Sequence, residues 1–470
     1  MAASVAASAA AEAQGADMLR IHDGVVRDNW PGIIQDQGLV YWPTELPDGT
    51  TRSYWREGQY YVFTSDEIAQ IDADAREIFA MLVEAGDYIV DHPALMVRMG
   101  IPEYTHKQVR ESWNRQNLGE DWGSVYGRYD VVYGRGSGYD DVYPELGRIR
   151  LYEFNADTPT SLLESAICQW YYYTDTDQGS DQWNGIWERL IEAWKRNLGH
   201  AEQVLGFKPK VHFVCSNEDS SGEDVKNLEC LQHTCQAAGY ETKALYIQNL
   251  FYDERDGRFY EYEGGPHLDV VFKLYPWEMM VREEWGPPAF QDMERIGEQP
   301  SVGAVNADTY TGGTLWIEPP YKMLWSNKSI LAVLWKLFGN DPERSQLLIP
   351  AYFIDERPEG MTNYVVKPIF GREGASVTVV ENGKTVLQTE GSYGTEGFIC
   401  QEYVPPPNYP GLNRDGGTED NHPVLGIWMI DGEPGGLGIR ESEGVITDDL
   451  SYFVPHVIAN PDREVLEHVR

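Results

Sequence analysis

The alternation of apolar and polar positions predicts two strands that carry acidic and amide side chains. Residues 125–134 (VYGRYDVVYG) alternate with a period of two and place Arg128 and Asp130 on one face. Residues 152–155 (YEFN) repeat the pattern, so Glu153 and Asn155 point the same way. We expect the two strands to be neighbours, which brings Asp130 beside the other two side chains.

Helical periodicity and capping signals predict helices around these strands. Residues 64–67 (TSDE) form a capping box before a helix that runs to about residue 85, with its apolar positions on one face. Residues 161–164 (SLLE) predict a second capping box, directly after a turn at 157–159. A further apolar helix is expected over residues 329–338, before several Gly-bounded strands.

The middle of the chain predicts a separate α/β unit. Short apolar strands over 211–215, 242–247 and 268–273 flank a helix over about 224–238. This order is typical of an open α/β unit with a largely parallel sheet, and residues 282–314 are expected to be an irregular connection. We divide the chain into a disordered tail (1–20), an N-terminal part (21–205), the α/β unit (206–316) and a C-terminal part (317–470).

Composition narrows the class of protein. The chain has 470 residues, 42% of them hydrophobic, which is enough for a large core. Its 37 Lys and Arg against 75 Asp and Glu give a net charge of −38, which repels phosphate backbones and argues against a nucleic-acid partner. Five cysteines without zinc spacing indicate reduced thiols and a cytoplasmic protein. No apolar run approaches the roughly 20 residues of a membrane span, and the Ala/Ser-rich start differs from a signal peptide.

The oxygen-bearing strand residues point to a metal. Carboxylate and amide oxygens suit Mg²⁺, which completes its shell with waters and nucleotide phosphate. The helix start that follows residues 152–155 offers free N–H groups to an anion. An ordinary strand–turn–helix with solvated polar ends explains the same spacing, so the rest of the chain has to decide.

A second stretch, residues 365–376 (VVKPIFGREGAS), is typical of a phosphate contact. Lys367 ends a β-branched strand, and the glycines of the 371–374 turn let backbone N–H groups approach a polyphosphate. A hairpin with a surface lysine is the alternative.

Three other positions have a functional and a plain interpretation. Lys328 lies at a helix start and is either a phosphate contact or a solvated first-turn residue. Residues 400–404 (CQEYV) end a strand before three prolines, where a hinge backbone would bind adenine and Glu402 a ribose. Arg440 closes a glycine-rich strand, either to meet a transferring phosphate or as a surface ion pair with Glu441.

Together these stretches resemble the glutathionylspermidine synthase family, whose synthetase domain is a circularly permuted ATP-grasp. The resemblance covers most of the chain from about residue 128 to residue 456. It rests on RYD at 128–130, YEFNADTPTSLLE at 152–164, LYPWE at 274–278, SNKSILAVLW at 326–335, KPIFGREGAS at 367–376, QEYVPPP at 401–407 and GLGIRE at 436–441. It implies an α+β fold, an ATP-grasp of the glutathionylspermidine/glutathione synthetase type with an inserted open α/β (pre-ATP-grasp) domain.

The resemblance also assigns roles to residues. The nucleotide and metal set it implies comprises Asp130, Glu153 and Asn155 as Mg²⁺ ligands, Lys328 and Lys367 as ATP contacts, Gln401, Glu402, Tyr403 and Val404 as the adenine hinge, Gly371 to Gly374 as the lid, Arg440 as the catalytic arginine and Arg128 as a catalytic contact to phosphate or substrate. The substrate set comprises Thr160 and Ser161 for the acid and Glu223 and Asp224 for the amine. For the last two, acidic residues favoured at a helix start are an equally good explanation.

The implied activity is an ADP-forming, ATP-dependent carboxylate–amine ligase that uses ATP and Mg²⁺. The acid attacks the γ-phosphate, and an amine or polyamine captures the acyl phosphate to form an amide. Bifunctional members carry an amidase domain with a cysteine nucleophile, but no cysteine precedes Cys168, so product hydrolysis is not expected. An ATP-grasp kinase and a non-catalytic nucleotide-binding regulator are the alternatives; the full set of metal and phosphate residues favours an enzyme.

Overall fold

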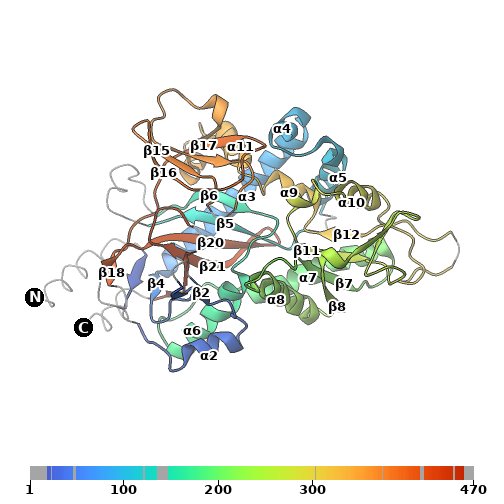
Figure 1. Ribbon diagram of the computed structural model, residues 1–470, viewed down its shortest axis with the longest axis horizontal. Coiled ribbons are helices and arrows are strands. Elements are labelled where there is room, and N and C mark those ends of the chain that lie inside the picture. The colour runs from blue at the N-terminus through green and yellow to red at the C-terminus, as the bar shows by residue number, and fades with distance from the viewer. Residues whose placement is uncertain are drawn as a thin grey trace, which may run out of the picture.

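The structure is a computed structural model that describes residues 18–459, apart from 23, 46–48, 120–121, 135–146, 302, 373, 413–417 and 448–449. Residues 1–17 of the predicted tail therefore lie outside the described residues. Figure 1 shows a mixed α/β molecule with a central sheet, a second sheet above it and a third at the far end.

The central sheet is antiparallel and contains the two strands with acidic and amide side chains. Its strand order is β22 (Tyr452–Val454), β21 (Glu433–Ser442), β20 (His422–Ile430), β5 (Tyr126–Val132) and β6 (Arg150–Asn155). β5 and β6 are neighbours, as predicted, and Asp130 lies opposite Glu153 in their register. β4 (Tyr60–Phe63) joins β1 (Leu19–Ile21) and β23 (His456–Ile458) in a small sheet, so strands from both ends of the described chain meet there.

The predicted parallel sheet is confirmed. Its order is β12 (Leu315–Ile317), β11 (Val270–Leu274), β7 (Val211–Cys215) and β8 (Thr242–Tyr246), and all three pairings are parallel. Every residue of β7 and β11 is buried. Helices α7 (Ile186–Leu205) and α8 (Glu223–Ala237) cover one face, which explains the short apolar runs in the sequence.

A second antiparallel sheet follows α11 (Ser329–Phe338), whose bounds are as predicted. The order is β13 (Ala351–Phe353), β17 (Phe398–Glu402), β14 (Tyr364–Pro368), β15 (Thr378–Glu381) and β16 (Lys384–Gln388). α11 packs between this sheet and α3 (Ser65–Val90), and burial on both sides accounts for its apolar sequence. α3 begins with the predicted capping box of Thr64 and Glu67, and its buried face continues past residue 85 to Val90.

The remaining elements are short. The helices are α2 (Trp30–Asp36), α4 (Pro93–Arg98), α5 (His106–Asn117), α6 (Gln169–Thr176), α9 (Trp277–Met280) and α10 (Gly286–Met293). Three hairpins are β2 (Pro43–Glu45) with β3 (Thr51–Ser53), β9 (Phe251–Asp253) with β10 (Arg258–Tyr260), and β18 (Gly411–Leu412) with β19 (Thr418–Glu419). Short helical turns span Glu103–Thr105, Glu164–Cys168, Ile247–Asn249, Pro320–Leu324, Arg344–Leu347 and Ile354–Glu356. α10 lies within residues 282–314, so that segment is less irregular than expected.

The second predicted capping box is wrong. Ser161 has a φ of 67°, outside the extended conformation of a capping residue, and Glu164 is completely buried. The Glu164 carboxylate accepts a hydrogen bond from the Tyr54 hydroxyl at 2.8 Å, whereas the Leu162 N–H donates to the Asn227 amide oxygen at 2.8 Å. Distant side chains therefore replace the local cap.

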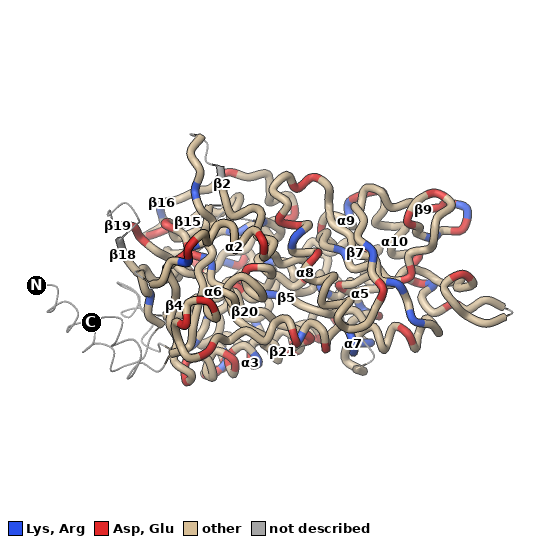
Figure 2. Tube along the Cα trace, turned by 90° about the horizontal axis from the view of Figure 1, so that it is seen from below, with Lys and Arg blue, Asp and Glu red and all other residues tan. Residues whose placement is uncertain are grey.

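The net negative charge is not confined to one patch. Figure 2 shows Asp and Glu positions along the whole trace, with Lys and Arg interspersed. No helix in the described part of the chain has the length and apolar content that crossing a membrane requires.

Candidate functional site

A cavity of about 930 Å³ opens where the three large sheets approach one another. It is lined by the end of β6 and the loop after it, by the loop between β7 and α8, by the start of α11, by the turn after β14 and by Arg440 of β21. Because ligands bind at the carboxyl ends of parallel strands, the loop after β7 is a favourable wall. Ten of the predicted site residues line it: Arg128, Glu153, Asn155, Thr160, Ser161, Glu223, Asp224, Lys328, Gly371 and Arg440.

Three oxygen-bearing side chains gather at the β5–β6 edge of this cavity. The Asn155 side-chain N–H group donates to Asp130 Oδ2 and to Glu153 Oε1, at 3.1 Å each. Strand alternation puts Glu153 and Asn155 on one face, and antiparallel pairing adds Asp130 from the neighbouring strand.

Cations surround these carboxylates. Arg128 donates to Asp130 from Nε at 2.8 Å, and Arg440 also donates to Asp130. Lys328 Nζ lies 3.0 Å from Glu153 Oε2 and donates to the Gly371 carbonyl at 2.7 Å. Burial alone would raise the pKa of Glu153, but the charges of Lys328 and Lys367 outweigh it and hold that pKa well below its usual value. Lys328 is therefore paired, not the solvated first-turn residue of the alternative.

Arg440 does not pair with Glu441, so the surface ion pair considered above is wrong. The Glu441 carboxylate is completely buried and is bound by Arg20 instead. Adjacent residues of a strand point to opposite faces, so Arg440 reaches Asp130 and the cavity while Glu441 faces the other way.

Lys367 and the predicted adenine segment lie beside β6 but do not line the cavity. Lys367 Nζ donates to Gln401 Oε1 at 2.7 Å and lies 5.6 Å from the centre of the Tyr152 ring. Its burial, helped by the nearby Lys328 and opposed by Glu153, lowers its pKa to about 8. The Tyr152 hydroxyl donates to the Val404 carbonyl at 2.7 Å, which ties the end of this segment to β6.

The backbone N–H groups of two residues in that segment are already occupied. Glu402 N–H donates to the Pro350 carbonyl at 2.7 Å, and Tyr403 N–H donates to the Asn363 carbonyl at 3.2 Å.

The turn predicted to be a lid contributes Gly371 and Arg372 to the cavity wall. Gly374 has a φ of 66°, and a Cβ atom there would lie 2.6 Å from Ile446 Cγ2, so glycine is required. Arg372 donates to Thr158 Oγ1 at 2.9 Å and to Glu278 Oε1 at 3.1 Å. Glu373, the remaining residue of the turn, lies outside the described residues.

The opposite end of the cavity is acidic. Glu223 and Asp224 occupy the first turn of α8, and no Lys or Arg of the described residues forms an ion pair with either. Burial, with the neighbouring Glu164, raises the pKa of Glu223 to about 8. Burial, with Asp219, raises the pKa of Asp224 to about 6. A helix N-terminus alone would lower these pKa values, so burial and like charges dominate here.

Thr160 and Ser161 lie between the basic and acidic ends. The Thr160 carbonyl accepts a hydrogen bond from Arg128, and the Ser161 hydroxyl lies 3.4 Å from the Tyr54 hydroxyl. They therefore form the part of the cavity wall that joins the two ends.

Several residues of the site were missed in the sequence. Asp157 accepts from Lys273 Nζ at 2.7 Å and from Trp277 N–H at 2.7 Å, which anchors the cavity loop to the end of β11. Arg372 and its partner Glu278 were missed too, although the first lies in the GREG turn and the second in the LYPWE stretch. The two sequence motifs indicated that both stretches matter, but not that Arg372 and Glu278 contact each other.

The donor set fits a magnesium ion that takes only some of its ligands from the protein and the others from phosphate and water. Among the residues that the structure describes, no group of three or more His, Cys, Asp or Glu side chains is placed to hold a metal. Two carboxylates with one amide match the usual case for Mg²⁺, which takes few protein ligands and completes its shell with waters and substrate oxygens. The amide of Asn155 already lies within hydrogen-bond distance of both carboxylates.

Comparison with known proteins gives a match over almost the whole chain. A family model described as "Glutathionylspermidine synthase preATP-grasp" matches residues 22–459. The "Putative acid--amine ligase" of Haemophilus influenzae is 29% identical over 91% of this chain and 96% of its own length.

Two larger proteins also match. The trypanothione synthetase of Crithidia fasciculata is 26% identical over 88% of this chain and 58% of its own length. The bifunctional glutathionylspermidine synthetase/amidase of Escherichia coli is 23% identical over 85% of this chain and 59% of its own length. The chain thus spans nearly all of the first relative and about three fifths of the other two.

Proposed function

Since the chain belongs to the glutathionylspermidine synthase family, we propose that it is an ADP-forming, ATP-dependent carboxylate–amine ligase. The acid is a peptide or amino-acid carboxylate, and the amine is cationic, an amine or polyamine. In this proposal residues 21–205 and 317–470 form a circularly permuted ATP-grasp core, and residues 206–316 are the inserted α/β domain.

One observation carries the proposal: the cavity is basic at one end and acidic at the other. Arg128, Lys328 and Arg440 line the end at β5 and β6, whereas Glu223 and Asp224 line the end at α8. A polyphosphate is attracted to the first end and an ammonium group to the second. A site for phosphate alone has no need of half-buried carboxylates without an ion-pair partner, which cost free energy in the empty protein.

The basic end supplies what phosphoryl transfer requires. Asp130, Glu153 and Asn155 would hold Mg²⁺, which would neutralise part of the charge of the phosphates. Lys328 and Lys367 would contact ATP, residues 401–404 its adenine, and the lid between Gly371 and Gly374 would cover the phosphates. Arg440, which lines the same end of the cavity, would stabilise the charge that develops on the transferred phosphoryl group.

The reaction follows from this placement. A carboxylate oxygen of the acid, held near Thr160 and Ser161, attacks the γ-phosphorus, and the bond to the β-phosphate oxygen breaks to release ADP. The amine, held by Glu223 and Asp224, loses a proton and attacks the acyl carbon, and inorganic phosphate leaves as the amide forms. Catalysis of this kind is mainly positioning and electrostatic stabilisation.

A screen of acids against amines tests the proposal and separates it from its rivals. ADP release is measured for each pair with Mg²⁺ and ATP, and the products are analysed by mass spectrometry. A ligase requires both an acid and an amine and gives an amide that is lighter by one water than their sum. Phosphorylation of a hydroxyl would indicate a kinase, and ATP binding without release of ADP for any pair would indicate a regulator.

A further inference from the structure

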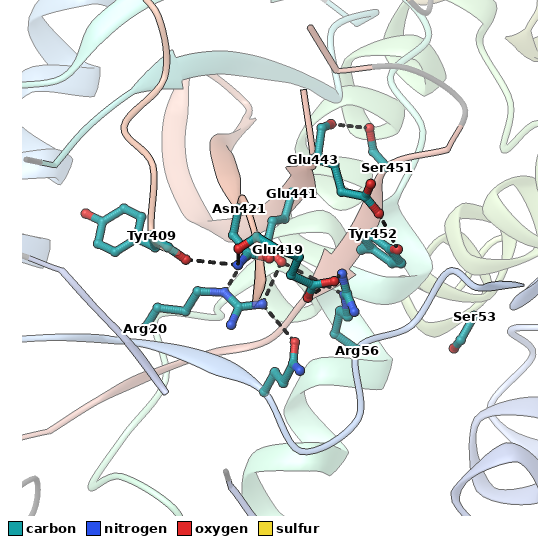
Figure 3. A network of polar contacts seen from close by, with 12 residues as sticks. Arg20, Ser53, Arg56, Tyr409, Glu419, Asn421, Glu441, Glu443, Ser451 and Tyr452 are labelled. Atoms are coloured by element: carbon teal, nitrogen blue, oxygen red, sulfur yellow. Dashed lines mark hydrogen bonds and ion pairs between the residues drawn. The ribbon is translucent and has the colours of Figure 1, made fainter. Parts of the chain in front are cut away.

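A buried ion pair anchors β21, the strand that carries Arg440, on the face that points away from the cavity. Arg20 Nε and a terminal guanidinium nitrogen donate to the two oxygens of Glu441, at 2.7 Å each, and the Tyr61 hydroxyl donates to Glu441 Oε2 at 2.6 Å. Figure 3 shows Glu441 and Arg20 in a polar network that joins segments far apart in the sequence. Arg20 and Glu441 are 421 positions apart in the sequence.

The pair is sealed from water. The side chains of Arg20 and Glu441 are 1% and 0% exposed. Burial opposes the charge on Arg20, but Glu441 more than compensates and raises the pKa of the guanidinium. A bidentate arginine–carboxylate pair also has a defined geometry, so it restricts where β21 can lie.

Arg440 is the immediate neighbour of this anchor on the other face of the strand. It is paired in register with Val424 of β20 and Phe453 of β22, and its side chain reaches Asp130 in the cavity. Because backbone atoms link the two Cα positions rigidly, a shift of Glu441 displaces the base of the Arg440 side chain.

We propose that Glu441 is a positioning residue, which with Arg20 and Tyr61 holds Arg440 at the transferring phosphate. The inference rests on the proposed function, because it requires Arg440 to act in turnover. It gives the N-terminal strand β1 a part in the site, although β1 contributes no residue to the cavity wall.

Glu57 offers a matched control. Its buried carboxylate also accepts hydrogen bonds from two guanidinium nitrogens of one arginine, Arg27, at 2.9 and 3.1 Å. One aromatic donor, Trp55 Nε1, adds a third hydrogen bond at 2.7 Å. Glu57 differs in that neither adjacent residue lines the cavity; its neighbour Arg56 pairs with Glu419 at 3.1 Å and lies 3.9 Å from Glu441. Glu57→Gln and Glu441→Gln therefore remove the same charge from the same kind of environment.

The test is a double-mutant cycle with Arg440→Ala, using the acid and amine that give the fastest ADP release in the screen above. Glu441→Gln should lower kcat about ten- to a hundredfold and leave the KM for ATP within about twofold, since an ångström of misplacement has effects of this size. In the Arg440→Ala background the same change should have no further effect. Glu57→Gln should leave kcat unchanged, although its unfolding midpoint falls with that of Glu441→Gln.

Other outcomes overturn the inference. If Glu441→Gln lowers kcat by the same factor in the Arg440→Ala background as in the parent, Glu441 acts elsewhere. If Glu57→Gln lowers kcat as much as Glu441→Gln does, the effect is a general structural one. If Glu441→Gln does not fold, Tyr61→Phe replaces it, because it removes one hydrogen bond and leaves no charge unpaired; unchanged kcat in that variant would count against the proposal. Normal turnover of Arg440→Ala alone would instead refute the proposed role of Arg440.

Discussion

The affinity for a cationic amine should rise steeply with pH, because the two carboxyl groups proposed to bind it hold their protons unusually well. Burial beside Glu164 raises the pKa of Glu223 to about 8, and burial beside Asp219 raises that of Asp224 to about 6. An ammonium group binds the ionised forms. Each proton still present must therefore be released before the amine can bind.

The expected size follows from these values. At pH 7 a group with a pKa of about 8 is roughly one-tenth ionised, so releasing its proton costs about 1.4 kcal/mol. The association constant should rise about tenfold per pH unit between pH 6 and pH 8, from Glu223 alone. Below pH 6 the slope should approach two, because Asp224 then holds its proton as well. The amine itself stays charged, since a primary ammonium titrates near pH 10.

Calorimetric titration with 1,4-diaminobutane, without ATP, measures this directly. Two buffers of different ionisation enthalpy give the number of protons released at each pH. Glu223→Gln should abolish the slope between pH 6 and pH 8 and, at pH 8.5, weaken binding about ten- to a hundredfold, the worth of a charge-assisted contact of about 1.5–3 kcal/mol. Glu229→Gln is the control, because Glu229 lies on the same helix, pairs with Lys226 and does not line the cavity.

A dissociation constant that stays flat from pH 5.5 to pH 8.5 would refute this reasoning. So would an unchanged slope in Glu223→Gln. Either result would mean that the acidic residues serve the start of α8 and that the amine binds elsewhere.

Three further predictions follow from the cavity. Glu153→Ala should abolish ADP release while the circular dichroism spectrum stays close to that of the parent; normal turnover would remove the metal from the mechanism. Lys367→Ala should weaken ATP binding, whereas Arg440→Ala should lower kcat more than ATP affinity, and steady-state kinetics would contradict this if Arg440→Ala changed only the KM for ATP. Asp157→Asn should destabilise the protein by about 3–5 kcal/mol in urea unfolding, because it leaves the buried Lys273 charge without its partner; a cost below about 1 kcal/mol would mean that the pair is not needed for stability.

The local part of the site was predictable from the sequence. Strand alternation alone puts Glu153 and Asn155 on one face, and the pairing of two nearby strands adds Asp130. The parallel sheet was predictable for a similar reason, since strands buried on both faces are short and largely apolar. The family resemblance, carried by long motifs in order, is confirmed by the match over residues 22–459.

Other features depended on contacts between distant segments. The capping box at 161–164 has the right residues, yet Glu164 is drawn into the interior by Tyr54, from a different part of the chain. Local preferences of about 1 kcal/mol give way when a tertiary hydrogen bond, such as that from the Tyr54 hydroxyl, competes for the same side chain.

The arginine that closes the glycine-rich strand illustrates the same division. Its place on a strand was predictable, and a period of two already places Glu441 on the opposite face. That Glu441 meets Arg20 was not predictable, because nothing in either neighbourhood specifies a partner 421 positions away. Sequence by itself determined which side chains share a strand face; which faces meet was decided by how the sheets pack, since only the folded chain brings distant segments close enough for charges and hydrogen bonds to pair.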